Sequence, residues 1–209
     1  FQSIISQCNH LKKNINFEKD PLIRMEMLTA LILSGLVFKD YEENFKIAVN
    51  ELERFTKSYF DNDGFPLSRN PNDLIFFTKY LLLCCETIKD AQKYMPEFLD
   101  DLIEKNLACI KLIKTPENNI PLFNGGSENE LIKFEKYIEA IDQKKRNKSN
   151  ILGGLFFAKS KNQIVYLDVG NPPSKKFSKN YQSGALSFEY FLDGRKIITN
   201  CGFGDKISS

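Results

Sequence analysis

The sequence predicts an α+β protein in which helices come first and an antiparallel sheet follows. Up to about residue 145, apolar side chains recur every three or four residues, as on one face of a helix. Beyond residue 150 they alternate with other side chains, as in strands. Elements segregated in this way indicate two domains and not a doubly wound sheet, and we place these domains at residues 1–145 and 146–209.

Start signals precede the predicted helices. Asp20-Pro21 supplies an N-cap followed by proline at the first helical position, and Asn70-Pro71 repeats this arrangement. Capping boxes are predicted at residues 40–43 and 127–130, and a further helix starts at residue 96. We expect about five or six helices in all, and successive helical hairpins of this kind suit a toroid or a solenoid.

The strand half is predicted from the alternating segments 164–169, 186–192 and 196–199. Asp193-Gly194 between the last two segments is a strong signal for a two-residue hairpin turn. We expect at least four antiparallel strands, too few to close a sandwich. The basic run at residues 144–148 is interpreted as a solvated linker between the halves, with a basic binding patch as the alternative.

Composition excludes several classes of protein. Of the 209 residues, 42% are hydrophobic and 27% are charged, which is typical of a globular chain and not of a disordered one. The 29 basic and 27 acidic residues leave a net charge of +2, so no strong field attracts nucleic acid. His10 is the single histidine, which excludes a histidine-built zinc site and any mechanism that needs two imidazoles. We expect no metal and no other cofactor.

The ends of the chain and its cysteines indicate whether it is part of a longer protein and in which compartment it lies. It begins at Phe1 without the pattern of a signal peptide and stops directly after predicted strands, so we expect an internal piece of a longer protein. The apolar stretches at residues 28–38 and 74–85 are shorter than the roughly 20 residues that span a membrane. The five cysteines form no CxxC pair, which suggests free, buried thiols and favours a reducing compartment.

The densest polar signal between helices is the segment 63–73. Arg69 offers a forked donor for carboxylates or sulfates, and the amides of Asn70 and Asn72 lie beside it in the sequence. The structural alternative is that Asn70 only caps the following helix.

Three further segments contain candidate functional residues. Gly125-Gly126, just before a capped helix, form either an anion-binding loop or a plain tight turn. Tyr181 could act as a general acid or base if its pKa were lowered. Cys201 is a weak nucleophile candidate, and we expect it to be a buried strand residue instead.

The order of these motifs resembles that of heparinase II/III family proteins, most closely a bacterial branch. The resemblance runs from about residue 20 to the end of the chain. It rests on five segments that occur in this order: 63–71, 122–128, 167–173, 184–189 and 200–202.

This resemblance implies the C-terminal part of an (α/α) toroid of helical hairpins followed by the first strands of an antiparallel β-sandwich. It further implies cleavage of a uronic-acid-containing polysaccharide by β-elimination, in which a base removes the proton beside a carboxylate that Asn or Arg neutralises. The substrate-binding residues would then be Arg69, Asn70, Asn72 and Asn124.

Tyr181 is the catalytic candidate, because Gln182 lies near the position where the family often has histidine and glutamine cannot shuttle a proton. The alternative is a non-catalytic glycan-binding or cell-envelope assembly protein with the same fold. The resemblance implies a periplasmic location, whereas the free cysteines favour the cytoplasm.

Overall fold

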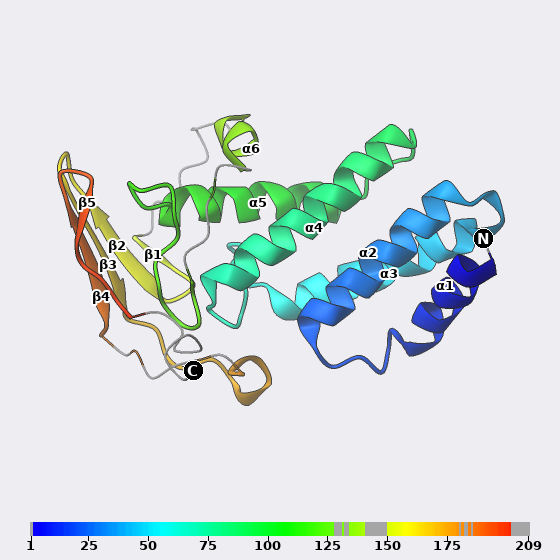
Figure 1. The fold of residues 1–209 in the computed structure, drawn as a ribbon, viewed down its shortest axis with the longest axis horizontal. Helices are drawn as coiled ribbons and strands as arrows, with labels where there is room; N and C mark the ends of the chain where they lie inside the picture. The colour runs from blue at the N-terminus through cyan, green and yellow to red at the C-terminus, as the bar shows by residue number, and fades with distance from the viewer. Residues whose placement is uncertain are drawn as a thin grey trace. The chain divides into compact units, whose positions relative to one another are not determined.

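The computed structural model describes residues 2–127, 131, 134–140, 150–179, 181, 184 and 186–201. Six α-helices and five strands lie in these ranges in the predicted order (Figure 1). The α-helices are α1 (Gln2–Asn14), α2 (Pro21–Val37), α3 (Glu42–Tyr59), α4 (Pro71–Asp90), α5 (Glu97–Ile113) and α6 (Glu135–Ala140). The strands are β1 (Ile151–Leu152), β2 (Leu155–Lys159), β3 (Gln163–Asp168), β4 (Phe188–Leu192) and β5 (Arg195–Ile198). Short 3₁₀ helices lie at η1 (Lys39–Tyr41) and η3 (Lys175–Phe177).

Contacts divide the chain into two compact units, which we call the helical unit and the mixed unit. The helical unit comprises Phe1–Ser58 and Phe76–Ile103, and the mixed unit comprises Tyr59–Ile75 and Glu104–Ser209. The boundary predicted at residues 145 and 146 and the basic run at 144–148 lie outside the described residues.

The helical unit is built around the apolar helix α2. Asp20 caps α2 as predicted, because its Oδ1 accepts a hydrogen bond from the backbone N–H of Leu22 at 3.0 Å. Gly35 lets α3 approach closely, since a Cβ atom at this position would overlap the backbone of Phe45. The α2 side chains Met25, Leu28, Leu31 and Ile32 are buried in this core.

The sheet is an antiparallel meander with the strand order β1-β2-β3-β4-β5, which confirms the prediction of at least four antiparallel strands. Asp193 and Gly194 form the predicted turn between β4 and β5, with φ angles of 50° and 79°. The inner face of the sheet contacts the end of α5, because the hydroxyl of Tyr166 donates to the backbone oxygen of Lys114 at 2.9 Å. Leu155, Phe157, Asp168, Glu189 and Phe191 lie with Tyr166 on this face and are buried.

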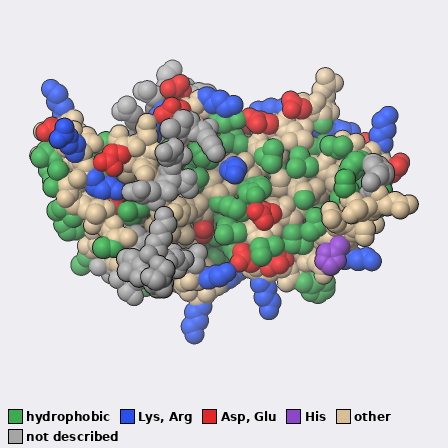
Figure 2. Space-filling model, viewed as in Figure 1, with side chains coloured by type: hydrophobic (Ala, Val, Ile, Leu, Met, Phe, Trp, Pro, Cys, Tyr) green, Lys and Arg blue, Asp and Glu red, His purple; other side chains and the backbone are tan. Residues whose placement is uncertain are grey.

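Several sequence predictions can be compared with this structure. No helix in the described ranges is long and apolar enough to cross a membrane. Helix α3 follows a 3₁₀ turn, and residues 128–130 of the second predicted capping box lie outside the described residues. Four cysteines are buried, but the prediction for Cys201 was wrong: it follows the end of β5 and is exposed. Acidic and basic side chains are interspersed over the face shown in Figure 2, as the small net charge suggests.

Candidate functional site

Arg69 lies in the loop between α3 and α4, and its buried side chain reaches two other loops of the mixed unit. The guanidinium donates from Nε to O of Gly153 at 2.9 Å, from Nη1 to O of Asn171 at 2.7 Å and from Nη2 to O of Gly154 at 3.2 Å. Nη2 also forms an ion pair with Oδ1 of Asp168. One bond from Nε, one from Nη1 and two from Nη2 engage four of the five N–H donors. Arg69 thus ties its loop to the β1–β2 turn and to the end of β3.

Two glycines make room for this guanidinium. A Cβ atom on Gly154 would lie 2.6 Å from Nε of Arg69, and one on Gly170 would lie 2.6 Å from its Cζ. Gly154 also has a φ of 79°, which side chains other than glycine rarely adopt. The sequence analysis missed both glycines and Asp168 as partners of Arg69, although segment 167–173 was one of the motifs that carried the resemblance.

The backbone of Arg69 is itself strained, with a φ of 59°. A left-handed conformation costs a side-chain-bearing residue about 1–2 kcal/mol. Its neighbours keep the loop in place, because Oδ2 of Asp73 accepts hydrogen bonds from the hydroxyls of Tyr59 at 2.9 Å and Ser68 at 2.6 Å. Strain maintained by surrounding bonds is a feature of functional loops.

Of the three candidate asparagines, Asn124 bonds Arg69 directly, while Asn70 and Asn72 lie at the start of α4 beside it in the chain. Oδ1 of Asn70 accepts from the N–H of Asn72 at 2.9 Å, so Asn70 caps α4 as the structural alternative proposed. Nδ2 of Asn72 donates to O of Gly125 at 3.1 Å, and Nδ2 of Asn124 donates to O of Arg69 at 3.3 Å. We call Arg69, Asn70, Asn72 and Asn124 the Arg69 cluster. Gly125-Gly126 forms a turn, and the hydrogen bond from Asn72 to O of Gly125 joins this turn to the cluster.

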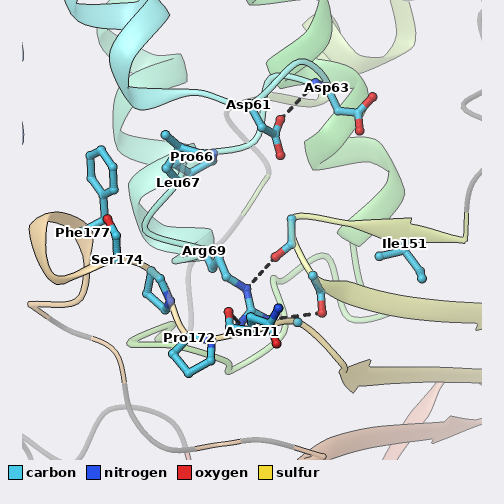
Figure 3. Close-up of a pocket in the computed structure, with 14 residues that line it drawn as sticks. Asp61, Asp63, Pro66, Leu67, Arg69, Ile151, Asn171, Pro172, Ser174 and Phe177 are labelled. Carbon is cyan, nitrogen blue, oxygen red and sulfur yellow. Dashed lines mark hydrogen bonds between the residues drawn. The ribbon is translucent and has the colours of Figure 1, made fainter.

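A pocket of about 480 Å³ adjoins Arg69 (Figure 3). It lies between the loop that carries Asp61 and the loop that carries Asn171, and the Arg69 side chain extends from the first loop toward the second. Burial raises the pKa of Asp61, and the charge of Asp63 raises it further, although backbone N–H groups oppose the shift. The apolar lining consists of Pro66, Leu67, Ile151, Pro172, Pro173 and Phe177. The pocket therefore combines carboxylates with apolar walls, and the one lining guanidinium already has an acidic partner.

Comparisons with known proteins agree with this architecture. Residues 143–208 match the family model described as Heparinase II/III-like, C-terminal. A crystal structure of heparinase III superposes with a TM-score of 0.78 at 15% sequence identity. The match covers 95% of this chain and 37% of the heparinase III chain. The C-terminal segment of the chain is thus similar to this family, and the fold is similar to that of heparinase III. A crystal structure of heparan sulfate lyase HepC from Pedobacter heparinus matches with a TM-score of 0.68 at 19% identity, over 86% of this chain and 32% of that one. No curated protein matches.

These matches confirm the predicted fold class of the chain. Its helices and its five-stranded antiparallel sheet resemble the corresponding part of heparinase III, which has a toroid followed by a β-sandwich. The chain spans about a third of the length of the structures it matches, 37% in one case and 32% in another.

Of the remaining candidates, Tyr181 is described by the structure and Gln182 is not. Tyr181 is half-buried, and its backbone N–H donates to O of Ser178 at 3.1 Å. No hydrogen bond among the described residues joins Tyr181 to the Arg69 cluster. Gln182 lies outside the described residues. Within the described ranges, no group of three or more His, Cys, Asp or Glu side chains could hold a metal ion.

Proposed function

We propose that the protein binds a uronic-acid-containing polysaccharide and cleaves it by β-elimination. The observation that supports this most directly is the fold shared with heparinase III and with a heparan sulfate lyase. The Arg69 cluster adds a second argument, because two strained residues, Arg69 and Asn124, face each other across a hydrogen bond. Backbone strain of this kind concentrates at binding and catalytic sites.

The reaction needs a base and preorganised donors. The proton beside a uronate carboxylate is weakly acidic, and its removal creates a second negative charge that hydrogen-bond donors must stabilise. In the proposed mechanism Tyr181 is the base that removes the proton, the electron pair left on carbon forms a carbon–carbon double bond, and the neighbouring glycosidic C–O bond breaks so that the leaving oxygen takes up a proton. One N–H of Arg69 Nη1 and one of Asn124 Nδ2 take no part in the bonds described above, and these donors would stabilise the charge.

Lyase activity can be tested on the natural full-length protein with a panel of uronic-acid polysaccharides. The unsaturated product of β-elimination absorbs in the near ultraviolet, and we expect its formation with at least one polysaccharide. Tyr181→Phe should abolish product formation, whereas Tyr94→Phe should not, because Tyr94 is an exposed tyrosine in the helical unit. Full activity of Tyr181→Phe would reject Tyr181 as the base. If no polysaccharide in the panel yields the product, the proposed lyase activity is rejected.

A non-catalytic glycan-binding or cell-envelope assembly protein is the second candidate. The observation that favours it is that Arg69 is already bound to Asp168 and to three backbone oxygens. Little of its positive charge is therefore available to neutralise a substrate carboxylate. Calorimetric titration with the same panel distinguishes the two functions. Binding without product formation would favour this second candidate.

A further inference from the structure

Glu189 is a buried carboxyl group in the middle of the sheet. It lies on the inner face of β4, directly opposite Tyr166 of β3, and its residue is 0% exposed. Among the described residues, no hydrogen-bond partner reaches its Oε2 atom. An apolar side chain would fill this position at a lower cost of desolvation, so the carboxyl group needs a reason other than packing.

The other carboxyl oxygen reaches the loop before α6. Oε1 of Glu189 accepts hydrogen bonds from the backbone N–H groups of Leu122 and Asn200, both at 3.3 Å. The side-chain Nδ2 of Asn200 in turn donates to O of Leu122 at 2.8 Å. Both backbone polar groups of Leu122 are therefore held by side chains from the C-terminal half of the sheet. We call Glu189 and Asn200 the Leu122 clamp.

The clamped residue directly precedes the turn that contains Asn124. Two residues after Leu122, Asn124 adopts a φ of 51° and Gly125 a φ of 89°. The turn is closed by a hydrogen bond from the N–H of Gly126 to O of Phe123 at 2.7 Å. Because the turn is short and closed, a shift at Leu122 would move Asn124 relative to the backbone oxygen of Arg69, to which it donates.

We propose that Glu189 and Asn200 are positioning residues that fix residues 122–126 and so place Asn124 against Arg69. The clamp consists of contacts within this chain and needs no ligand. Its effect on ligand binding rests on the proposed function of the Arg69 cluster. One experiment therefore tests the clamp, and a second tests its effect on ligand binding.

The first experiment measures amide hydrogen exchange over residues 122–126. Glu189→Ala leaves the N–H of Leu122 without its acceptor, and we expect exchange there to accelerate about tenfold or more, as the loss of one hydrogen bond allows. Glu189→Gln retains an oxygen acceptor and should preserve protection. Burial raises the pKa of Glu189, so the neutral amide also resembles the protonated acid.

Two variants make this result specific. Glu117 also accepts from a backbone N–H, that of Lys196 at 3.3 Å, but at the surface, so Glu117→Ala should leave exchange at 122–126 unchanged. Asn200→Ala removes the bond to O of Leu122 without emptying the centre of the sheet. Asn200→Ala should also accelerate exchange at residues 122–126, and it can replace Glu189→Ala in the experiment if that variant does not fold. Wild-type protection in Asn200→Ala and in a folded Glu189→Ala would overturn the clamp.

The second experiment is a double-mutant cycle on glycan affinity between Glu189→Ala and Asn124→Ala. If Glu189 acts through Asn124, each single variant should weaken binding, and the double variant should bind no more weakly than Asn124→Ala. Glu189→Gln should retain wild-type affinity, whereas Glu189→Met, which fills similar space but offers no oxygen acceptor to Leu122, should bind as weakly as Glu189→Ala. Additive losses would overturn the positioning role. If the wild-type protein binds no glycan, the proposed function fails, while the exchange experiment still decides the clamp.

Discussion

Arg69 Nη2 and Asp168 Oδ1 form an ion pair inside the mixed unit, where the two side chains are only 9% and 0% exposed. Burial of both charges is costly unless their remaining hydrogen-bonding groups are satisfied. The backbone oxygens of Gly153, Gly154 and Asn171 accept most of the other donors of Arg69. The pair therefore helps to tie three loops together beside the pocket that Arg69 lines.

Removal of the guanidinium should destabilise the protein strongly. Arg69→Ala leaves the carboxylate of Asp168 buried without a counter-ion, so we expect the free energy of unfolding to fall by about 3–5 kcal/mol. Arg69→Lys should fall between wild type and alanine, because an ammonium group cannot reach acceptors spread over four residues. Urea unfolding followed by circular dichroism measures both changes.

The control is an exposed ion pair. Lys57 and Glu53 pair on the surface of α3 with side chains 71% and 39% exposed, so Lys57→Ala should cost less than about 1 kcal/mol. A loss for Arg69→Ala no larger than this control would contradict the structural role of the pair.

The close approach of Arg69 to Gly154 allows a matched comparison of two glycines. Gly154 and Gly194 both have a φ of 79°, but a Cβ on Gly154 would meet Arg69 at 2.6 Å and one on Gly194 would meet nothing within 4 Å. Gly194→Ala therefore reports backbone strain alone. Gly154→Ala should cost about 1–3 kcal/mol more, as overpacking does.

Coupling to Arg69 identifies the source of that difference. In an Arg69→Ala background the clash is absent, so Gly154→Ala should cost no more than Gly194→Ala. Thermal or urea unfolding of the four combinations measures this coupling. An excess cost that persists without the Arg69 side chain would show that other atoms cause it.

Local signals predicted much of the fold, whereas the site depended on distant contacts. Asp20 and Asn70 were recognisable as caps because a cap depends on its own next few residues, and Asp193-Gly194 was recognisable as a turn for the same reason. The partnership of Arg69 with Asp168 spans 99 residues, and nothing in either local sequence indicates it. The sequence therefore predicted Arg69 as a functional candidate without showing that its charge is already neutralised.

Cys201 should be the fast-reacting thiol of the native protein. It is exposed, while Cys8, Cys84, Cys85 and Cys109 are buried. Burial also raises the pKa of Cys84 to about 11, which suppresses the reactive thiolate at neutral pH. With a chromogenic disulfide reagent we expect one rapid equivalent among these cysteines and the rest only after unfolding. Cys201→Ser should remove the rapid phase, and its persistence would place an accessible thiol elsewhere.

The buried carboxyl of Glu189 predicts a pH dependence of stability. Burial raises its pKa above the ordinary value of 4.5 for glutamate, although Lys196 and the N–H groups of Asn200 and Leu122 oppose the shift. Below pH 4.5 both the folded and unfolded states hold this proton, so the group contributes no pH dependence there. As the pH rises, the unfolded chain releases the proton first, and the folded state loses stability until the pH passes the folded pKa.

Glu189→Gln lacks this titration and isolates it. The free energy of unfolding of Glu189→Gln minus that of the wild type should be nearly constant in acid and should increase as the pH rises above 4.5. In Lys196→Met the decline should be larger in total and extend to higher pH than in the wild type, because Lys196 lowers the pKa of Glu189 and lies 4.0 Å from its Oε1. Urea unfolding at a series of pH values measures both differences. A flat difference would mean that Glu189 ionises as readily in the folded protein as in the unfolded chain, and a difference that grows toward acid would mean that it ionises more readily when folded.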